Sequence, residues 1–299
     1  MKRFLFSLSL LPLLLSCQLN RNSNRDTAQA GSPMVTTPDE AGQKVPSASS
    51  IPVEKDPEEA YDTIAGDWTI RVRRAPNDVV ITITPEYRLR DNSLFFTVEH
   101  AGQTVCREKE LRTGDIVGSE GELKIYGNGT LQHLSSKTAY FHVSCFYPES
   151  DVGDFMLYCL STNGETALYA LTMEMGDECS ECINQLSEFF TLYWHQRKMG
   201  CDSLPEMRSF LEHHCEPSFL QALERGEAHS IAQELFGEPT GMDYEQAIRS
   251  VDFRCENHQE GVTVTYSPRE GEEPRAFLVR MNINEYPFKI ASVEPCRSL

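Results

Sequence analysis

Short runs of alternating hydrophobic and polar residues fill the chain from Tyr61 to Gly176, and turn residues separate them. In the first run, Trp68, Ile70 and Val72 alternate with polar residues, which is the pattern of a strand with one buried face. About eight such strands, with glycine turns between them and no helical period, predict an all-β antiparallel sandwich or barrel. The other runs are Val79–Thr84, Leu94–His100, Thr104–Leu111, Leu123–Tyr126, Thr138–Tyr147, Phe155–Ser161 and Ala167–Glu174.

The hydrophobic period becomes helical after Gly176. Apolar residues from Ile183 to Trp194 recur at intervals of three and four, which predicts an amphipathic helix that ends near Gly200. The segment Ser203-Leu204-Pro205-Glu206 combines a capping box with a first-turn proline and predicts a second helix. Helices followed by strands of an antiparallel sheet predict an α+β domain. Further helices are expected at Pro217–Arg225 and Glu227–Phe236, and strands at Val251–Cys255, Val262–Tyr266, Ala276–Ile283 and Phe288–Val293.

The first seventeen residues combine a basic start, an apolar run and a cysteine. Lys2 and Arg3 precede Phe4–Leu15, which is apolar apart from two serines and a proline. This run is too short to cross a bilayer as a stable helix and fits a signal peptide. The following Leu14-Leu15-Ser16-Cys17 resembles the lipobox of bacterial lipoproteins.

That resemblance implies a lipid anchor. Residues 1–16 would be removed as a signal peptide, and acyl chains, palmitate among them, would be attached to Cys17. Two or three chains anchor a protein stably, whereas one anchors it weakly. We therefore expect a lipid-anchored protein of the bacterial cell envelope. In some Gram-negative groups, acidic residues just after the acylated cysteine mark lipoproteins for surface export. Residues 18–22 contain none, so we expect the protein to face the periplasm from the outer or inner membrane. The alternatives are cleavage after Ala28-Gln29-Ala30 and an uncleaved anchor.

Gln18 to Ala60 contains no Phe, Trp or Tyr and carries five prolines, so it cannot bury enough apolar surface to become ordered. The expected layout is therefore a signal peptide at 1–16 and a lipid anchor with a disordered linker at 17–60. An all-β domain at 61–176 and an α+β cone-like domain at 177–299 follow.

The last strands also carry a family resemblance. Phe277-Leu278-Val279-Arg280-Met281, a turn at Asn284-Glu285 and Phe288-Lys289-Ile290 are similar to the final hairpin of the nuclear-transport-factor-2-like (cystatin-like cone) superfamily. The resemblance implies a cone, in which helices pack on a curved antiparallel sheet. Such cones include small-molecule isomerases and dehydratases as well as binding and structural modules.

Catalytic chemistry has no clear signature in the sequence. An enzymatic cone would place acid–base residues at its open end, where Asp243, Tyr244, His195 and His229 can be named, but no spacing links any two of them. A solvated Asp, a Tyr at the edge of the core and surface histidines are the structural alternative. No G-x-S-x-G and no phosphate-binding loop occurs. We therefore predict no catalytic residue and no cofactor.

The charge of the chain argues against nucleic acid as a partner. The formal net charge is −18, and basic residues occur only as local pairs such as Arg73-Arg74. Binding to the phosphate backbone requires a basic face, which this sequence lacks.

Ten cysteines point to disulfide bonds, because an exported chain meets an oxidising compartment. Nine remain when Cys17 is set aside, so at least one is unpaired or bound to another molecule. A hairpin centred on Val152 would place Cys145 opposite Cys159, within reach of a disulfide. The alternative is two buried free thiols side by side.

Cys179-Ser180-Glu181-Cys182 lies between a strand and a helix, and a local disulfide between Cys179 and Cys182 is the leading interpretation. Redox activity is one alternative, since a helix N-terminus lowers the pKa of a thiol. A zinc site with His213, His214 or Cys215 is another, but these three are adjacent and lack ligand spacing. We predict no metal.

A tether and two compact domains without catalytic residues indicate a non-enzymatic binding or interaction module. Its partners would be the membrane, through the acyl chains on Cys17, and an envelope protein or small ligand. The alternative is a small-ligand receptor or enzyme that uses the concave pocket of the C-terminal domain. A pocket lined by converging ionisable groups would favour the alternative, and a filled interior would favour the module.

Overall fold

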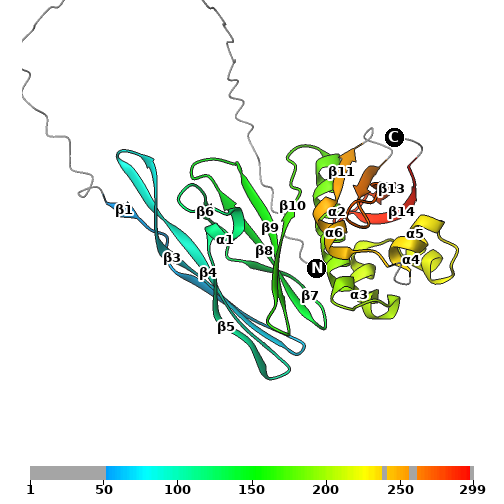
Figure 1. Ribbon diagram of the computed structural model, residues 1–299, viewed down its shortest axis with the longest axis horizontal. Helices are drawn as coiled ribbons and strands as arrows, with labels where there is room; N and C mark the ends of the chain where they lie inside the picture. The colour runs from blue at the N-terminus through cyan, green and yellow to red at the C-terminus, as the bar shows by residue number, and fades with distance from the viewer. Residues whose placement is uncertain (1–51, 238–240, 256–260, 297–299) are drawn as a thin grey trace, which may run out of the picture. The chain divides into compact units, whose positions relative to one another are not determined.

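The computed structural model describes residues 52–237, 241–255 and 261–296, which all fall within one compact unit. The signal peptide, Cys17 and the spacer as far as residue 51 lie outside the described residues. The described part has three β-sheets and six α-helices and is a mixed α+β structure (Figure 1). No helix in these ranges is both long enough and apolar enough to cross a membrane.

The first sheet has the order β1-β4-β3-β2, with β5 paired to β4. All its pairings are antiparallel except that of β1 with β4. Its longest strand joins two of the predicted runs, because Pro76 sits at a register shift rather than at a strand end. The strands are β1 (Val53–Glu54), β2 (Glu59–Ala65), β3 (Trp68–Thr84), β4 (Tyr87–His100) and β5 (Gln103–Leu111).

The predicted spacer extends too far toward the C-terminus. β1 and the start of β2 lie within 17–60, and between them Asp56 accepts a hydrogen bond from Lys124 Nζ (2.8 Å). The Lys124 side chain is only 4% exposed, so its charge requires this partner. Strand pairing and this ion pair order a segment whose composition alone predicts disorder.

The second sheet has the order β10-β9-β8-β6, with β7 paired to β8. Its two faces are buried in two different cores, as the alternation along its strands requires. Phe141, Val143 and Leu160 pack with the first sheet, whereas Tyr140 and Leu157 pack with the helices. The strands are β6 (Lys124–Ile125), β7 (Thr130–Leu134), β8 (Thr138–Phe146), β9 (Gly153–Ser161) and β10 (Thr166–Leu171), and a short helix, α1 (Thr113–Val117), precedes them.

The helices confirm the local sequence signals. The long amphipathic helix is α2 (Glu178–Lys198), and the predicted capping box between Ser203 and Glu206 starts α3 (Leu204–His214). α5 begins three residues later than predicted, because His229 caps it. The remaining helices are α4 (Pro217–Glu224), α5 (Ser230–Phe236) and α6 (Tyr244–Ser250), of which α6 was not predicted.

The third sheet is antiparallel throughout, in the order β11-β12-β13-β14. Its four strands match the predicted runs to within two residues at each end, because each is a short β-branched or aromatic segment between turns. They are β11 (Asp252–Cys255), β12 (Val262–Tyr266), β13 (Arg275–Asn282) and β14 (Lys289–Pro295).

Candidate functional site

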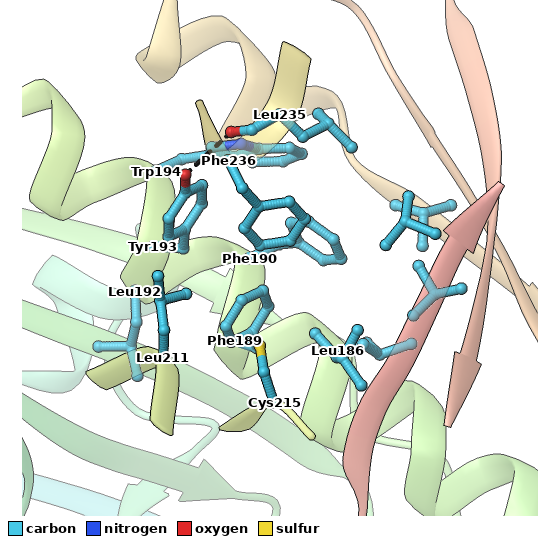
Figure 2. Close-up of a cluster of buried hydrophobic side chains, with 14 of the residues drawn as sticks. Leu186, Phe189, Phe190, Leu192, Tyr193, Trp194, Leu211, Cys215, Leu235 and Phe236 are labelled. Carbon is cyan, nitrogen blue, oxygen red and sulfur yellow. Dashed lines mark hydrogen bonds between the residues drawn. The ribbon is translucent and has the colours of Figure 1, made fainter. Parts of the chain in front are cut away.

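Aromatic side chains fill the space between α2 and the third sheet. The Phe190 and Phe277 rings lie 5.6 Å apart, and the Trp194 and Tyr266 rings 5.2 Å apart. Phe190 and Trp194 are fully buried. Figure 2 shows Phe189, Phe190, Tyr193 and Trp194 of α2 gathered with Phe236 of α5. A substrate would have to displace these rings, so this part of the interior is a packed core. A pocket of about 300 Å³ lies between the start of α2 and the third sheet, where Glu178 and Arg280 are among its lining residues.

The four residues named for acid–base chemistry are not brought together. Asp243 caps α6 by accepting from Gln246 N (3.1 Å), and His229 caps α5 by accepting from Ile231 N (3.2 Å). The Tyr244 ring packs against the Arg197 guanidinium, 5.5 Å from it. Each of these three side chains therefore has a structural contact of its own.

His195, the fourth, is buried among aromatic rings. Its Nδ1 lies 3.0 Å from the Tyr140 hydroxyl, and the Tyr169 ring packs edge-on at 5.5 Å. Burial lowers its pKa to about 4, and the Lys198 charge adds to that effect against the opposing charge of Glu245. A neutral, enclosed imidazole of this kind joins the second sheet to α2.

The cysteine pairings differ from both predicted pairs. Cys179 bonds to Cys255 on β11, 76 residues away, and Cys182 is a free thiol. The local Cys179–Cys182 disulfide is therefore wrong. The side chain of Cys182 lies in the hydrophobic core, where burial raises its pKa to about 11 and so disfavours the reactive thiolate.

The predicted disulfide between Cys145 and Cys159 in the β8–β9 hairpin is also wrong. The turn is centred on Glu149 and Ser150, so Cys145 pairs in register with Asp154 and Cys159 with Tyr140. The two thiols point to opposite faces of the sheet, Cys145 toward the first sheet and Cys159 toward the helices. Both are free and buried, and they pack as small hydrophobic side chains.

The zinc alternative finds no support among the described residues, where no group of three or more His, Cys, Asp or Glu side chains is arranged to hold a metal ion. Cys179 is held in its disulfide, and Cys215 is fully buried.

A surface groove of about 950 Å³ lies at the turn end of the second sheet. We call it the acidic-rimmed groove. Three segments far apart in sequence form it: the residue after β6, the β8–β9 turn and the segment after β10. Its lining residues are Tyr126, Phe146, Glu149, Ser150, Asp151, Val152, Gly153, Phe155, Met173, Glu174 and Met175.

Aromatic rings form one side of the groove. Phe146 packs edge-on against Phe155 (5.2 Å) and against Tyr126 (6.3 Å). The Tyr126 backbone is fixed by a hydrogen bond, which its carbonyl oxygen accepts from the buried guanidinium of Arg74. Lys124 Nζ lies 5.1 Å from the Tyr126 ring, but its charge is taken up by Asp56.

Large apolar side chains of the groove are unusually exposed: Met175 is 87%, Val152 65% and Met173 43% exposed. The backbone beneath the two methionines is fixed, since Glu174 exchanges hydrogen bonds with Asn184 of α2 (2.6 and 2.9 Å). Clustered exposed apolar side chains on a fixed backbone are typical of interaction surfaces, and methionine adapts to varied partners.

The rim of the groove is negative. Glu149, Asp151 and Glu174 line it, and no Lys or Arg does so among the described residues. Burial raises the pKa of the Tyr126 phenol, and the nearby charges of Asp56 and Glu149 raise it further. The groove therefore combines an apolar floor with a negative potential.

Sequence reasoning missed this groove. The two signals that could have indicated it are Met173-Glu174-Met175 just beyond a strand and Val152 in a hairpin turn, where large apolar residues are not expected. Comparison with family models and with curated proteins finds no match for this chain.

Proposed function

We propose that this protein is a cell-envelope lipoprotein that acts as a tethered, non-enzymatic binding module, with the acidic-rimmed groove as its binding surface. In this proposal the first two sheets form an antiparallel sandwich, and α2–α6 with the third sheet form the cone-like half. The acyl chains on Cys17 hold the module at the membrane, facing the periplasm. The exposed cluster of Val152, Met173 and Met175 in one groove is the observation that carries the proposal.

The partner that fits this groove is a polypeptide segment with apolar anchor residues next to Lys or Arg. The apolar floor would gain from burying aliphatic or aromatic anchors. The rim carries Glu149, Asp151 and Glu174 without a neighbouring cation in the lining, so basic residues on the partner would complement it.

The aromatic filling between α2 and the third sheet supports this function over the enzymatic alternative. Phe190 and Trp194 have no exposed surface, and the pocket between the start of α2 and the third sheet is lined by none of the four acid–base residues. The four acid–base residues are separately engaged in caps and packing contacts.

Binding of short synthetic peptides to the purified soluble part tests the groove. One series would combine aromatic anchors with lysines, and a matched series would carry glutamates in place of the lysines. We expect the lysine series to bind, and the double variant Met173→Ser/Met175→Ser to weaken binding about tenfold or more, through lost apolar burial.

Ile64→Ser is the matched control, because Ile64 is 80% exposed on β2 and does not line the groove. The groove proposal fails if neither series binds, if the glutamate series binds equally well, or if Ile64→Ser weakens binding as much as the methionine variants do.

The lipid anchor is tested separately. Cys17→Ser should move the protein from the membrane fraction to the soluble fraction and abolish labelling by a radioactive fatty acid. A variant that stays membrane-bound, or a mature protein whose mass shows no acyl chains, would overturn the anchor without affecting the groove.

A further inference from the structure

A second concavity, of about 330 Å³, lies between β7, α2 and α3 and does not overlap the acidic-rimmed groove. It holds about ten times the volume of one water molecule in the liquid, which suits a small organic ligand. Its lining is mostly polar, with Leu192 and Phe210 as the apolar members. The full lining is Gln132, His133, Glu188, Leu192, Ser209, Phe210, His213 and His214.

Glu188 is the one carboxylate of this lining, and within the described ranges no Lys or Arg pairs with it. Burial raises its pKa, and the neighbouring Gln132 amide only partly opposes that rise. A partly desolvated carboxylate without a counter-charge is unfavourable unless something else supplies the positive charge.

The hydrogen bonds of His133 fix which of its nitrogens can accept. Gln196 Nε2 donates to the Leu192 carbonyl oxygen (3.3 Å), so Gln196 presents Oε1 to His133. That oxygen can only accept, and His133 Nε2, 3.3 Å away, must therefore donate to it. Burial lowers the pKa of His133, so the ring is neutral and its Nδ1 keeps a free lone pair.

The other groups strengthen this acceptor character. Burial and the charges of neighbouring groups lower the pKa of His214 to about 3, so it too is neutral near pH 7. The Phe210 ring packs 4.6 Å from the His214 ring and is one of the two apolar members of the lining. The Lys289 charge also acts on His214, but its ammonium donates to the Glu212 carbonyl oxygen (3.2 Å) and does not line the pocket.

We propose that this pocket binds a small organic cation, such as a primary amine or diamine, with Glu188 as its counter-ion and His133 as a hydrogen-bond acceptor. The volume exceeds the need of a bare metal ion, and the described residues provide no three-ligand metal group. The pocket would make the protein a receptor for a soluble amine as well as a partner-binding module, independently of the groove.

Calorimetric titration with three ligands of matched length tests this site: putrescine, 1,4-butanediol and succinate, which are cationic, neutral and anionic. We expect putrescine alone to bind. Glu188→Gln should weaken putrescine binding about tenfold or more, because a charge-assisted hydrogen bond is lost while the shape is kept. A thermal melt of Glu188→Gln checks that the variant is folded.

Glu212→Gln is the matched control for the overall negative charge. Glu212 is an exposed glutamate of α3 that pairs with Arg208 (2.9 Å) and does not line the pocket. The control should bind putrescine as the wild type does. The proposal is overturned if putrescine does not bind at about 10 mM. It is equally overturned if succinate or butanediol binds as well, or if Glu188→Gln and Glu212→Gln behave alike.

Discussion

Removing the Cys179–Cys255 disulfide gives a prediction whose magnitude follows from the structure. The bond closes a loop with a sequence separation of 76 residues. In the chain-entropy treatment, opening such a loop returns about 15 cal/mol/K to the unfolded chain, or about 4.5 kcal/mol at 25 °C. The double variant Cys179→Ser/Cys255→Ser should therefore lose about 2–4.5 kcal/mol of unfolding free energy. A chain of this size would melt about 10 °C lower.

Urea denaturation followed by tryptophan fluorescence measures this loss, since Trp194 lies in the core on α2, the same helix that carries Cys179. Wild type treated with a reductant should match the double variant. Alkylation of the unreduced, denatured wild type should label every thiol except Cys179 and Cys255. A loss below about 1 kcal/mol, or labelling of both cysteines, would refute the argument that this bond constrains the chain.

Three further predictions concern single side chains. Burial raises the pKa of Asp56, but the hydrogen bond from Lys124 opposes this and helps to lower the pKa overall. The ion pair therefore stabilises the fold fully above the pKa that Asp56 has in the unfolded chain, and this stabilisation is lost as the pH falls through the pKa of Asp56 in the folded protein. Lys124→Met should lower the unfolding free energy, measured by urea denaturation, by about 3 kcal/mol near pH 7 and by less near pH 3. An equal loss at both pH values would contradict this. Gly153→Ala should destabilise the hairpin, because its Cβ would lie 2.2 Å from the Cys145 carbonyl oxygen, and an unchanged melting temperature would contradict this. Because the pKa of Glu188 is raised in the folded state, that state binds the proton more tightly than the unfolded chain does, and the stability of the wild type falls as the pH rises through this pKa. Glu188→Gln should therefore be more stable than the wild type above this pKa. A difference in unfolding free energy between the two proteins that stays constant from about pH 3 to 8 would disprove this.

Local signals in the sequence were sufficient for α2–α5 and for the third sheet. Ser203 and Glu206 cap α3 as predicted, and the apolar period from Ile183 to Trp194 lies within α2. These elements depend on residues within a few positions of one another, so the sequence carries their signals directly. α1 and α6 escaped prediction because each spans only a few residues, which is too short for a hydrophobic period.

Features that depend on distant residues could not be predicted. The partner of Cys179 follows from the way β11 lies beside the start of α2, and no spacing in the sequence encodes it. The β8–β9 turn is centred on Glu149 and Ser150 rather than on Val152, and this difference places Cys145 and Cys159 on opposite faces of the sheet instead of facing each other. The groove joins Tyr126 to Met175 across the ends of different strands, so it exists only once the sheet has formed.

The two-sided burial of the second sheet determines how the protein can be divided. A fragment that stopped at residue 176 would leave Tyr140, Leu157 and Tyr169 without the helices that cover them, and the complementary fragment would lose the wall of its own core. Neither piece is suited to expression by itself, and heat should melt both halves in a single cooperative transition. Recombinant work on this protein should therefore keep the stretch from residue 52 onward intact.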